Sequence, residues 1–532
     1  MGRYTVFAVV VILSLATAVA GFWWPLAWWG CVPLTALAAL GVWDLAQKRH
    51  SLLRNYPVLG HMRWVFEGVR PEIRQYLIES DRDEVPFSRE ERSIVYQRAK
   101  GEEGLRPFGT RHDVYAAGYL WLTHSIAAKP HGHSDYRVKV GGDACTKPYA
   151  ASTLNISAMS FGALGANAIE ALNRGARMGG FAHDTGEGGI SAFHRAGGGD
   201  LIWELGTAYF GCRTDAGGFD ADKFAERAGA EQVKMIEVKL SQGAKPGHGG
   251  VLPAAKITPE IADARGVPMD RDCVSPPAHN AFETPIGFMH FLQQLREASG
   301  GKPVGFKLCV GHRWEFMAVV KAMLETGIRP DFIVVDGKEG GTGAAPLEFA
   351  NHIGTPLAEG LTFVRNTLLG AGLRDDIRIA ASGKMITAFD LIWASALGAD
   401  WVNSARGFMF ALGCIQAQSC HTNTCPSGVA TQDRLRQRSL VVPDKAERVA
   451  SFHRNTLRAV GDLVGAAGFD HPRELQPWHI QVRQKNGDVL PADKAFPILP
   501  VGCLRDDGEC GDGDYDTPWR LARAGSFTPA DA

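Results

Sequence analysis

The sequence predicts an α/β protein, a (β/α)8 TIM barrel with an N-terminal transmembrane helical hairpin and a helical collar. Three observations predict it: an uncharged apolar segment at the start, short apolar runs alternating with helix-like segments after Pro148, and polar residues gathered just after those runs. With 532 residues the chain is long enough for several domains or for one large barrel with extensions. The formal net charge of -1 gives no reason to expect nucleic acid as a partner.

Residues 1–47 are expected to form the transmembrane hairpin anchor. No charged residue lies from Thr5 to Trp43, which is enough for two spans of about 20 residues each, and the tryptophans between them are typical of a membrane interface. Arg3 precedes the segment and Lys48 follows it, so the positive-inside rule puts both ends in the cytoplasm. The protein is therefore expected at the cell membrane, with a cytoplasmic catalytic domain. Two alternatives stay open: a cleaved signal peptide ending near Ala18–Ala20, and a buried helical hairpin of a soluble protein.

Three further regions follow the anchor. Residues 48–147 are polar and helix-rich, carry no catalytic pattern and are expected to pack as a helical collar. Residues 148–470 are expected to form the barrel, and residues 471–532 a C-terminal extension. The ten cysteines are not spaced as a secreted disulfide framework. Cys503 and Cys510 lie in the extension, where they can pair or bind a metal, but a solvated loop is favoured.

Short apolar runs after Pro148 are the evidence for the barrel. Buried strands that are apolar on both faces and alternate with helices indicate parallel βα units. Polar residues concentrated at the carboxyl ends of such strands are typical of a (β/α)8 barrel site. A doubly wound sheet is the alternative, but the chain lacks the Gly-x-Gly-x-x-Gly of the usual dinucleotide site. The runs are Leu154–Ser160, Met235–Leu240, Val304–Val310, Phe332–Asp336, Ile377–Ser382 and Trp401–Ser404.

Two lysines lie inside apolar runs. An unpaired buried ammonium group costs several kcal/mol, so Lys307 is expected to point into the barrel mouth toward an anionic partner, with a structural ion pair as the alternative. Lys239 has the same setting, and the Gly-rich loop after it carries Lys245, which suits a carboxylate or phosphate ligand. Glu187 follows another short strand, where a site carboxylate and a solvated loop residue are both compatible with the sequence.

The loops after the last two predicted strands predict a phosphate pocket. One strand ends in Ser382-Gly383-Lys384, and the next leads to Arg406. In barrels these two loops commonly bind phosphate with backbone N–H groups, and Gly341 and Gly343 would complete the rim. A phosphate pocket and a cationic barrel mouth, beside a cysteine cluster, indicate flavin mononucleotide, FMN. Lys307 would then stabilise the negative edge of reduced flavin.

Three cysteines form the most distinctive motif, Gly-Cys414-x5-Cys420-x4-Cys425-Pro. Closely spaced thiolates usually hold a soft metal, and a run that ends in Cys-Pro is typical of iron–sulfur clusters. Zinc usually takes pairs spaced Cys-x2–4-Cys. The motif therefore predicts electron transfer and a redox enzyme, with ordinary buried thiols as the alternative.

Six longer motifs follow one another in a fixed order: Ser157-Ala-Met-Ser-Phe-Gly162, Gly186-Glu-Gly-Gly189, Ser241-Gln-Gly-Ala-Lys-Pro-Gly247, Ser275-Pro-Pro277, Gly340-Gly-Thr-Gly-Ala344 and Cys420-His-Thr-Asn-Thr-Cys-Pro-Ser-Gly-Val-Ala-Thr-Gln432. With these motifs, the segment from about Leu154 to Gln432 resembles the FMN-binding synthase domain of the glutamate synthase family. The membrane anchor fits the shorter members that lack the glutaminase domain.

The resemblance implies a barrel that carries FMN and a [3Fe-4S] cluster and that aminates 2-oxoglutarate reductively to L-glutamate through 2-iminoglutarate. By motif, the cluster ligands would be Cys414, Cys420 and Cys425. The expected catalytic residues are Glu187, Lys239 and Lys245. The residues expected around the flavin are Met159, Ser160, Gly162, Gln242, Lys307, Gly341, Gly343, Ser382, Gly383, Lys384 and Arg406.

The departures from the family pattern define the partners and the alternatives. With no N-terminal catalytic cysteine and no glutaminase domain, ammonia would arrive free or from a separate glutaminase subunit. With no dinucleotide fold, a ferredoxin-like protein or a separate reductase would donate electrons. His248 stands where the family usually has Glu, and Val251 where it usually has Gln. These two substitutions motivate an alternative, the same cofactors acting on another amino-acid or 2-oxo-acid substrate. A non-catalytic membrane electron-transfer subunit is the third hypothesis.

Overall fold

The computed structural model divides into two units, Met1–Arg89 and Glu90–Ala532. The residues that the structure describes are 2–80, 82, 86–102, 104–130, 135–505 and 509–530.

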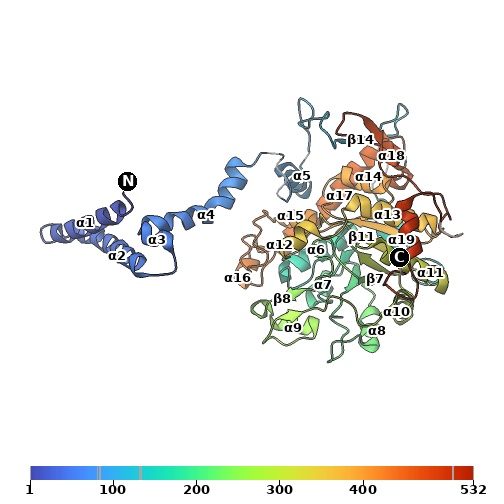
Figure 1. Ribbon diagram of the computed structural model, residues 1–532, viewed down its shortest axis with the longest axis horizontal. Coiled ribbons are helices and arrows are strands. Elements are labelled where there is room, and N and C mark those ends of the chain that lie inside the picture. Colours follow the sequence, from blue (N-terminus) through green and yellow to red (C-terminus); the bar gives the residue numbers. More distant parts are fainter. Residues whose placement is uncertain are drawn as a thin grey trace. The chain divides into compact units, whose positions relative to one another are not determined.

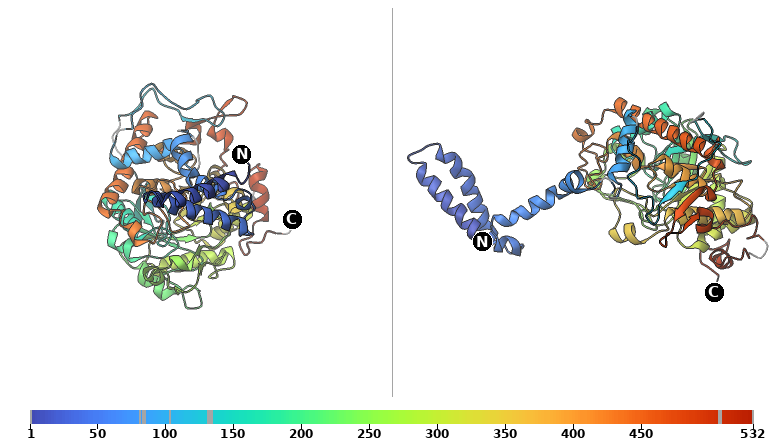
Figure 2. Two further views of the ribbon diagram at one scale, coloured as in Figure 1. Left: turned by 90° about the vertical axis from the view of Figure 1, so that its left-hand side faces the viewer. Right: turned by 90° about the horizontal axis from the view of Figure 1, so that it is seen from above.

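The first unit begins with two apolar helices, α1 (Thr5–Ala20) and α2 (Ala27–Ala46), that lie side by side as a hairpin (Figures 1 and 2). A hydrogen bond of 2.8 Å between the hydroxyls of Ser14 and Thr35 joins them. Within the described residues, α2 alone is long and apolar enough to cross a membrane, whereas α1 is apolar but has 16 residues. The expected pair of apolar helices is present, α2 alone has the length expected of each span, and the membrane anchor stays a prediction.

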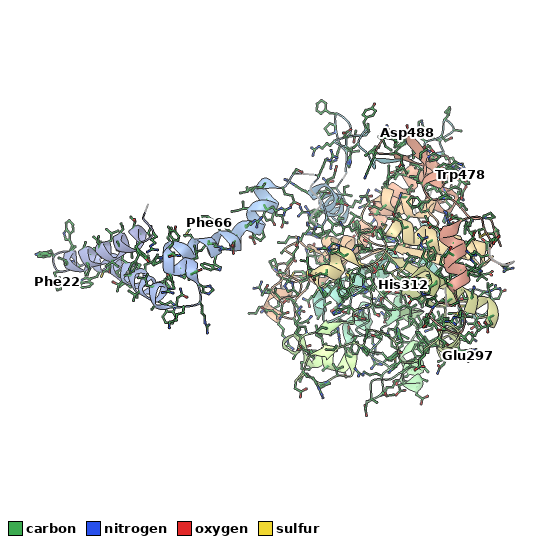
Figure 3. The ribbon with its side chains drawn as sticks, in the orientation of Figure 1. Phe22, Phe66, Glu297, His312, Trp478 and Asp488 are labelled. Atoms are coloured by element: carbon green, nitrogen blue, oxygen red, sulfur yellow. A yellow bond between two sulfur atoms is a disulfide. The ribbon has the colours of Figure 1, made fainter. Side chains whose placement is uncertain are left out.

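The first unit ends in a helix with a continuous apolar face. α3 (Ser51–Asn55) and the short helix η1 (Leu59–His61) lead to α4 (Met62–Ile73), which runs into η2 (Arg74–Ile78). Figure 3 shows the side chain of Phe66 on α4. Large apolar side chains recur along the segment at intervals of three or four residues, the spacing that places them on one helix face. They are between 38% and 60% exposed: Val65, Phe66, Val69, Ile73 and Tyr76.

The second unit is built on a closed barrel of eight parallel strands. The barrel closes where β13 pairs with β4, with Val402 opposite Leu154. The prediction of a (β/α)8 barrel is confirmed, and closure excludes the doubly wound sheet. The strands are β4 (Leu154–Ile156), β5 (His183–Asp184), β6 (Leu201–Leu205), β7 (Val233–Lys239), β10 (Val304–Leu308), β11 (Phe332–Asp336), β12 (Arg378–Ser382) and β13 (Trp401–Ser404).

Helices follow the strands and surround the barrel (Figure 1). Local sequence fixes several of their starts. Thr284 caps α10 with Pro285 in the first turn, and Thr387 with Asp390 forms a capping box on α14. The helices after the strands are α6 (Ala166–Gly179), α7 (Ala192–Gly197), α8 (Ala221–Ala228), α9 (Pro259–Arg265), α10 (Pro285–Ala298), α11 (Arg313–Thr326), α12 (Leu347–His352), α13 (Leu357–Gly370), α14 (Ala388–Ala396), α15 (Arg406–Leu412), α16 (Arg434–Gln437) and α17 (Val442–Ala466).

An antiparallel hairpin closes the amino-terminal end of the barrel. It consists of β2 (Arg137–Val140) and β3 (Tyr149–Ser152). Its buried side chains join one apolar cluster with residues from the starts of the barrel strands, among them Met235, Phe332 and Trp401. The barrel floor is therefore dry and packed, and the opposite, carboxyl end is left for a site.

Residues 48–147 are only partly helical. After α5 (Arg89–Lys100), the segment supplies β1 (Leu120–Leu122) and β2. β1 pairs with the C-terminal extension, in a three-stranded antiparallel sheet with β14 (Ile480–Arg483) and β15 (Val489–Pro491). The part of the segment in the second unit therefore contains strands as well as a helix: β1 pairs with the distant β14, and β2 with the adjacent β3.

The C-terminal extension contains a disulfide between Cys503 and Cys510. The expectation of a solvated loop without pairing is therefore wrong: the two thiols lie on one short loop whose ends meet. The second unit also contains several small elements around the barrel. They are the β8 (Val251–Leu252) and β9 (Cys273–Val274) hairpin after β7, the extension's helices α18 (Ala492–Ala495) and α19 (Gly513–Leu521), and the short helices η3 (Ala254–Lys256), η4 (Pro472–Glu474) and η5 (Pro477–His479).

Candidate active site

A pocket lies at the carboxyl ends of the barrel strands, where loops from across the sequence meet. In a parallel barrel all strand carboxyl ends open on the same side, which explains why residues so far apart in sequence share one wall. Ten of the residues expected from the sequence line this pocket: Met159, Ser160, Glu187, Lys239, Gln242, Lys307, Gly341, Gly343, Arg406 and Cys420.

Seven other expected residues lie outside the pocket lining. Buried Lys245 donates a hydrogen bond of 3.2 Å to the carbonyl of Gly249, and burial lowers its pKa. Ser382 lies 3.3 Å from the hydroxyl of Ser157. The remaining residues outside the lining are Gly162, Gly383, Lys384, Cys414 and Cys425.

Glu187 and Lys239 form an ion pair in the pocket wall. Their Oε2 and Nζ atoms are 2.9 Å apart, and the side chains are 22% and 10% exposed. Burial opposes ionisation of Glu187, but Lys239 holds its pKa below the usual value. The carboxylate lies between two glycines: an added Cβ at Gly206 or at Gly250 would come within 2.8 Å of the Glu187 side chain. Glu187 is thus a fixed, ionised wall residue, which rules out the solvated-loop alternative.

Lys307 lines the pocket and is also ion-paired. Its ammonium group donates to Oε2 of Glu204 on strand β6 and lies 3.6 Å from Oε1 of Glu237. Burial alone would lower the pKa of Lys307, but these carboxyls raise it well above its usual value. Both interpretations of the sequence therefore hold: the lysine faces the barrel mouth, and its anionic partners belong to the protein.

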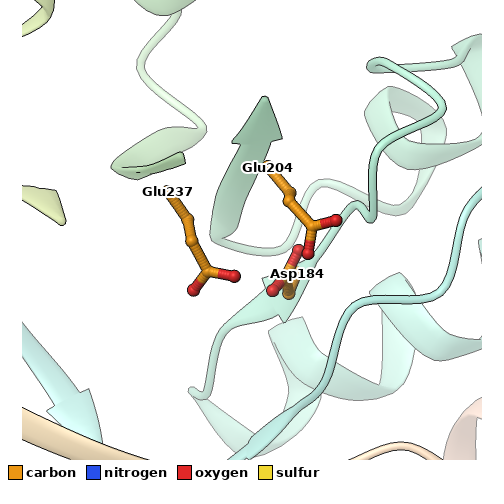
Figure 4. Close-up of side chains that lie close together, drawn as sticks. All are labelled: Asp184, Glu204 and Glu237. Atoms are coloured by element: carbon orange, nitrogen blue, oxygen red, sulfur yellow. The ribbon is translucent and has the colours of Figure 1, made fainter. Parts of the chain in front are cut away.

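Three buried carboxyls lie together beneath the pocket (Figure 4). Asp184, Glu204 and Glu237 each place an oxygen within 4.8 Å of the others. Burial raises the pKa of Asp184 to about 7, with a further contribution from Glu204. Burial and Asp184 likewise raise the pKa of Glu237 well above its usual value. None of the three was assigned to the site from sequence, although Glu204 and Glu237 lie in apolar strands as Lys307 does.

Arg406 also lines the pocket, next to the glycine loop. Its guanidinium lies against Gly341 so closely that an added Cβ there would be 2.1 Å from Nη2. The same nitrogen is 3.5 Å from the carbonyl of Thr342. By contrast, apart from Gly343 and its two chain neighbours, no atom of the described residues lies within 4 Å of a Cβ built on Gly343. This glycine loop and Arg406 form a cationic wall with free space beside it, the setting that an anionic group requires.

The cysteine loop borders this wall. Cys420 lines the pocket, and the Lys256 ammonium donates to its carbonyl at 2.9 Å. Burial raises the pKa of Cys414 to about 11. Burial opposes ionisation of Cys425 too, but the Ser427 hydroxyl and nearby backbone N–H groups hydrogen-bond its sulfur and lower its pKa. In this loop Cys425 is buried and its sulfur is hydrogen-bonded, Cys420 lines the pocket, and Cys414 is half-buried.

The three sulfurs do not converge as they would around a single ion. Among the described residues, the only three ligand atoms all within 4.8 Å of one another are those of the carboxyl trio. Zinc–sulfur bonds of about 2.3 Å in a tetrahedron place sulfurs roughly 3.8 Å apart. The loop is therefore wider than a preformed single-ion site, and its donor set suits a cofactor with several metal ions.

The two departures that motivate another substrate lie off the pocket wall; the family pattern also differs at Ala278-His279-Asn280. His248 is exposed, with Nδ1 2.7 Å from the carbonyl of Gly249, and Val251 is 49% exposed. His279 is a contributor that sequence reasoning missed. Its ring nitrogens lie 2.9 Å from the Tyr209 hydroxyl and from the Lys239 carbonyl, so it fixes the backbone that carries Lys239.

Fold and site together define a barrel enzyme with a cationic pocket beside a three-cysteine loop. Residues 137–470 match the family model described as the conserved region in glutamate synthase. The chain belongs to the glutamate synthase family. This membership confirms the resemblance seen in the sequence.

Three curated relatives give the degree of similarity. The glutamate synthase large subunit-like protein YerD of Bacillus subtilis (strain 168) is 37% identical over 502 residues, 87% of this chain and 95% of that protein. The archaeal-type glutamate synthase [NADPH] of Thermotoga neapolitana is 33% identical over 321 residues. The archaeal glutamate synthase [NADPH] of Methanocaldococcus jannaschii is 34% identical over 322 residues. The alignments with these last two span 60% of this chain and 60% of each relative.

Solved structures with a similar backbone are distant. A mandelate oxidase mutant with (S)-mandelic acid is 16% identical, with a TM-score of 0.39 over 72% of this chain and 87% of its own. A likeness of that degree says nothing about ligand or activity.

Proposed function

We propose that this protein is a glutamate synthase-like oxidoreductase that makes L-glutamate from 2-oxoglutarate and ammonia, through 2-iminoglutarate, with FMN and a 3Fe–4S cluster. One observation carries the proposal. The Glu187–Lys239 pair, Lys307 and Arg406 line the same pocket as Cys420 of the three-cysteine loop. A cationic pocket that touches a thiolate loop suits an anionic redox cofactor next to a metal cluster.

The residues present fit FMN. Arg406 with the Gly341–Gly343 loop would hold the phosphate, because a guanidinium against exposed backbone is a good anion site. Lys307 and Gln242 would face the flavin ring from the barrel mouth. FMN, when bound, supplies hydride transfer and exchanges electrons singly or in pairs.

The residues present also fit an iron–sulfur cluster. Cys414, Cys420 and Cys425 would hold it, since three thiols spread wider than a single ion requires match a cluster with three protein ligands. Hydrogen bonds to the Cys425 sulfur and the cation of Lys256 would stabilise its negative charge. A bound cluster passes single electrons, which a ferredoxin-like protein or a separate reductase would supply.

The proposed substrate accounts for the lysines. 2-Oxoglutarate carries two carboxylates, and Lys239 and Lys245 lie on the strand and loop that border the pocket. The fixed carboxylate of Glu187 would hold or accept a proton beside the substrate carbon. One 2-oxo acid, one ammonium ion, two electrons and two protons give one amino acid and one water. The ammonia would arrive free or from a separate glutaminase subunit.

The exposed positions of His248 and Val251 favour 2-oxoglutarate over another substrate. Because neither side chain lines the pocket, these departures leave its lining unchanged. The open pocket in the described residues also argues against a non-catalytic electron-transfer subunit.

We further propose that the protein is held at the cell membrane, with a cytoplasmic catalytic domain. The apolar α1–α2 hairpin and the charges that flank it support this location, and the exposed apolar face of α4 supports a second contact with the lipid interface. The disulfide Cys503–Cys510 is a feature more typical of oxidising compartments. Labelling of these cysteines in intact cells with a membrane-impermeant reagent after reduction tests the location: protection supports a cytoplasmic domain, and labelling overturns it.

The function is tested with full-length protein purified without oxygen in detergent. We expect bound flavin, about three iron atoms per chain and the electron paramagnetic resonance of an iron–sulfur cluster. Photoreduced enzyme should be reoxidised by 2-oxoglutarate with ammonium, with glutamate as product. Pyruvate with ammonium is the control substrate. Reoxidation by pyruvate but not by 2-oxoglutarate would move the proposal to another 2-oxo acid, and protein without flavin or iron would overturn it.

A further inference from the structure

The carboxyl trio of Asp184, Glu204 and Glu237 is the most unusual part of the barrel interior. All three side chains are at most 2% exposed. Within the described part of the chain, neither carboxyl oxygen of Glu237 has a hydrogen-bond partner, and a buried carboxylate without hydrogen bonds is costly. Figure 4 shows the three side chains lying close together, and they come from the adjacent strands β5, β6 and β7.

The position of Lys307 argues against a bound metal cation at the carboxyl trio. A divalent ion would suit three carboxylates this close together. Here, however, the ammonium of Lys307 already donates to Glu204 and lies 3.6 Å from Glu237. A second positive ion would be repelled by this lysine, so the trio is left to balance its charge with protons.

The charges that face the trio do not balance when all groups are ionised. Four carboxyls meet here, the trio and Asp336 of β11, against the ammonium groups of Lys307 and Lys239. Lys239 is shared, since it is 3.9 Å from Glu204 but 2.9 Å from Glu187. Like charges at this separation in a buried site favour one retained proton. The raised pKa values of Asp184 and Glu237 agree with this geometry.

The carboxyl trio is also connected to the pocket, so a proton can pass between them. Glu204 belongs both to the trio and to the pocket lining, whereas Asp184 and Glu237 lie below the wall. From Glu204 the chain of charged groups continues through Lys239 to Glu187, both of which line the pocket. A proton shared by the trio therefore has one continuous route of charged groups to the reacting centre.

We propose that Asp184, Glu204 and Glu237 share one proton as a buried reservoir and release it into the pocket through Glu204 when the pocket is reduced. In each transfer the O–H bond of Glu237 or Asp184 breaks and an O–H bond on Glu204 forms. Glu204 then donates the proton to the pocket, and the trio regains one from solvent. The proposed reaction consumes two protons for two electrons, and one-electron carriers bring none. The inference rests on the proposed function for this demand, but not on which 2-oxo acid is used.

Infrared spectroscopy of the full-length protein in detergent tests the shared proton directly. At about pH 6, below the raised pKa of Asp184, we expect an infrared C=O band from a protonated carboxyl group. The band should shift in D2O, and in the Glu237→Gln variant it should lose the absorption of one carboxyl. Glutamine has the shape and charge of the protonated acid, so the fold should tolerate it. Asp184→Asn is the second variant, with the same expected loss. The matched control is Glu226→Gln, an exposed glutamate on α8, which should leave the band unchanged.

The release step is tested by the infrared difference between oxidised and photoreduced protein. The wild type and Glu226→Gln should show a change in the carboxyl band, and Glu237→Gln should not. An unchanged band in both trio variants would overturn the shared proton, and a band insensitive to reduction would reduce the trio to a structural role. Protein that lacks flavin would refute the proposed function and the release step with it, while the static band would still decide whether the trio holds a proton.

Discussion

Replacing Asp184 by asparagine should change how stability depends on pH. The pKa of Asp184 is about 7 in the folded protein and 3.8 when unperturbed, so the folded state binds more protons between these values. Stability from this group is fully present below pH 3.8 and is lost as the pH rises through about 7. Each pKa unit corresponds to about 1.4 kcal/mol, so wild type should lose about 3 kcal/mol relative to the variant between about pH 5 and pH 8. The asparagine side chain would keep the hydrogen bond that Gly186 N–H donates at 2.9 Å, because its carbonyl oxygen can accept it.

Thermal unfolding of the full-length protein in detergent measures this effect. The unit Glu90–Ala532 has roughly 440 residues, and an unfolding entropy of about 2.1 cal/mol/K per residue converts about 3 kcal/mol into about 3 °C. The Tm of Asp184→Asn should therefore gain about 3 °C on wild type when the pH is raised from about 5 to about 8. Glu226→Gln should show no such gain. Parallel Tm curves for wild type and Asp184→Asn would refute the raised pKa.

Three other outcomes follow from the site and the anchor. Cys420→Ser should lose the bound iron, measured by metal analysis, and retain flavin. The control Cys212→Ser, at a buried free thiol elsewhere, should keep both. Iron retained in Cys420→Ser would contradict the proposed cluster ligands. Lys245→Met should raise the KM for 2-oxoglutarate by about 10-fold or more, since a lost charged hydrogen bond costs about 1.5–3 kcal/mol; an unchanged KM would remove Lys245 from the substrate. In a chain without residues 1–47, Phe66→Asp should weaken binding to anionic vesicles by about 10-fold, measured by co-sedimentation. The reason is that burying a Phe side chain is worth about 1.5–3 kcal/mol. Unchanged co-sedimentation would exclude α4 as an interfacial helix.

The sequence predicts most of the barrel because most strands are apolar runs. β5 was expected only as a short strand before Glu187, without bounds, because it consists of His183 and Asp184 and has no apolar run. β6 was missed. It is a five-residue strand that contains Glu204. Because this residue is charged, the sequence does not indicate that the strand is buried on both faces. The β2–β3 hairpin was predicted as part of a helical collar and the start of the barrel. Its two strands are short and pair only with each other, so their alternation of apolar and polar residues is too brief to indicate strands.

The site was predictable to the extent that single residues reveal burial. Lys307 was found because a charge inside an apolar strand must face a partner, and the same argument applies to Glu204 and Glu237. What the sequence cannot give is the pairing itself. Lys307 meets Glu204 only because β7 lies between β6 and β10 and the barrel is closed. Register and closure are long-range properties, so they emerge only when all eight strands are assembled.

The buried layer of charged side chains next to the pocket costs folding stability, which argues that it has a role in the chemistry. Buried ion pairs and charged groups can often be replaced by apolar side chains of similar volume with no loss, or with a gain of about 1–4 kcal/mol. The amino-terminal half of this barrel is filled in this way, by a buried apolar layer that includes Met235, Phe332 and Trp401. One layer higher, toward the pocket, three carboxyls and Lys307 replace such packing. Stability alone would favour extending the apolar layer upward, so the change from apolar to charged at the level of the pocket indicates that the charges serve the chemistry above them.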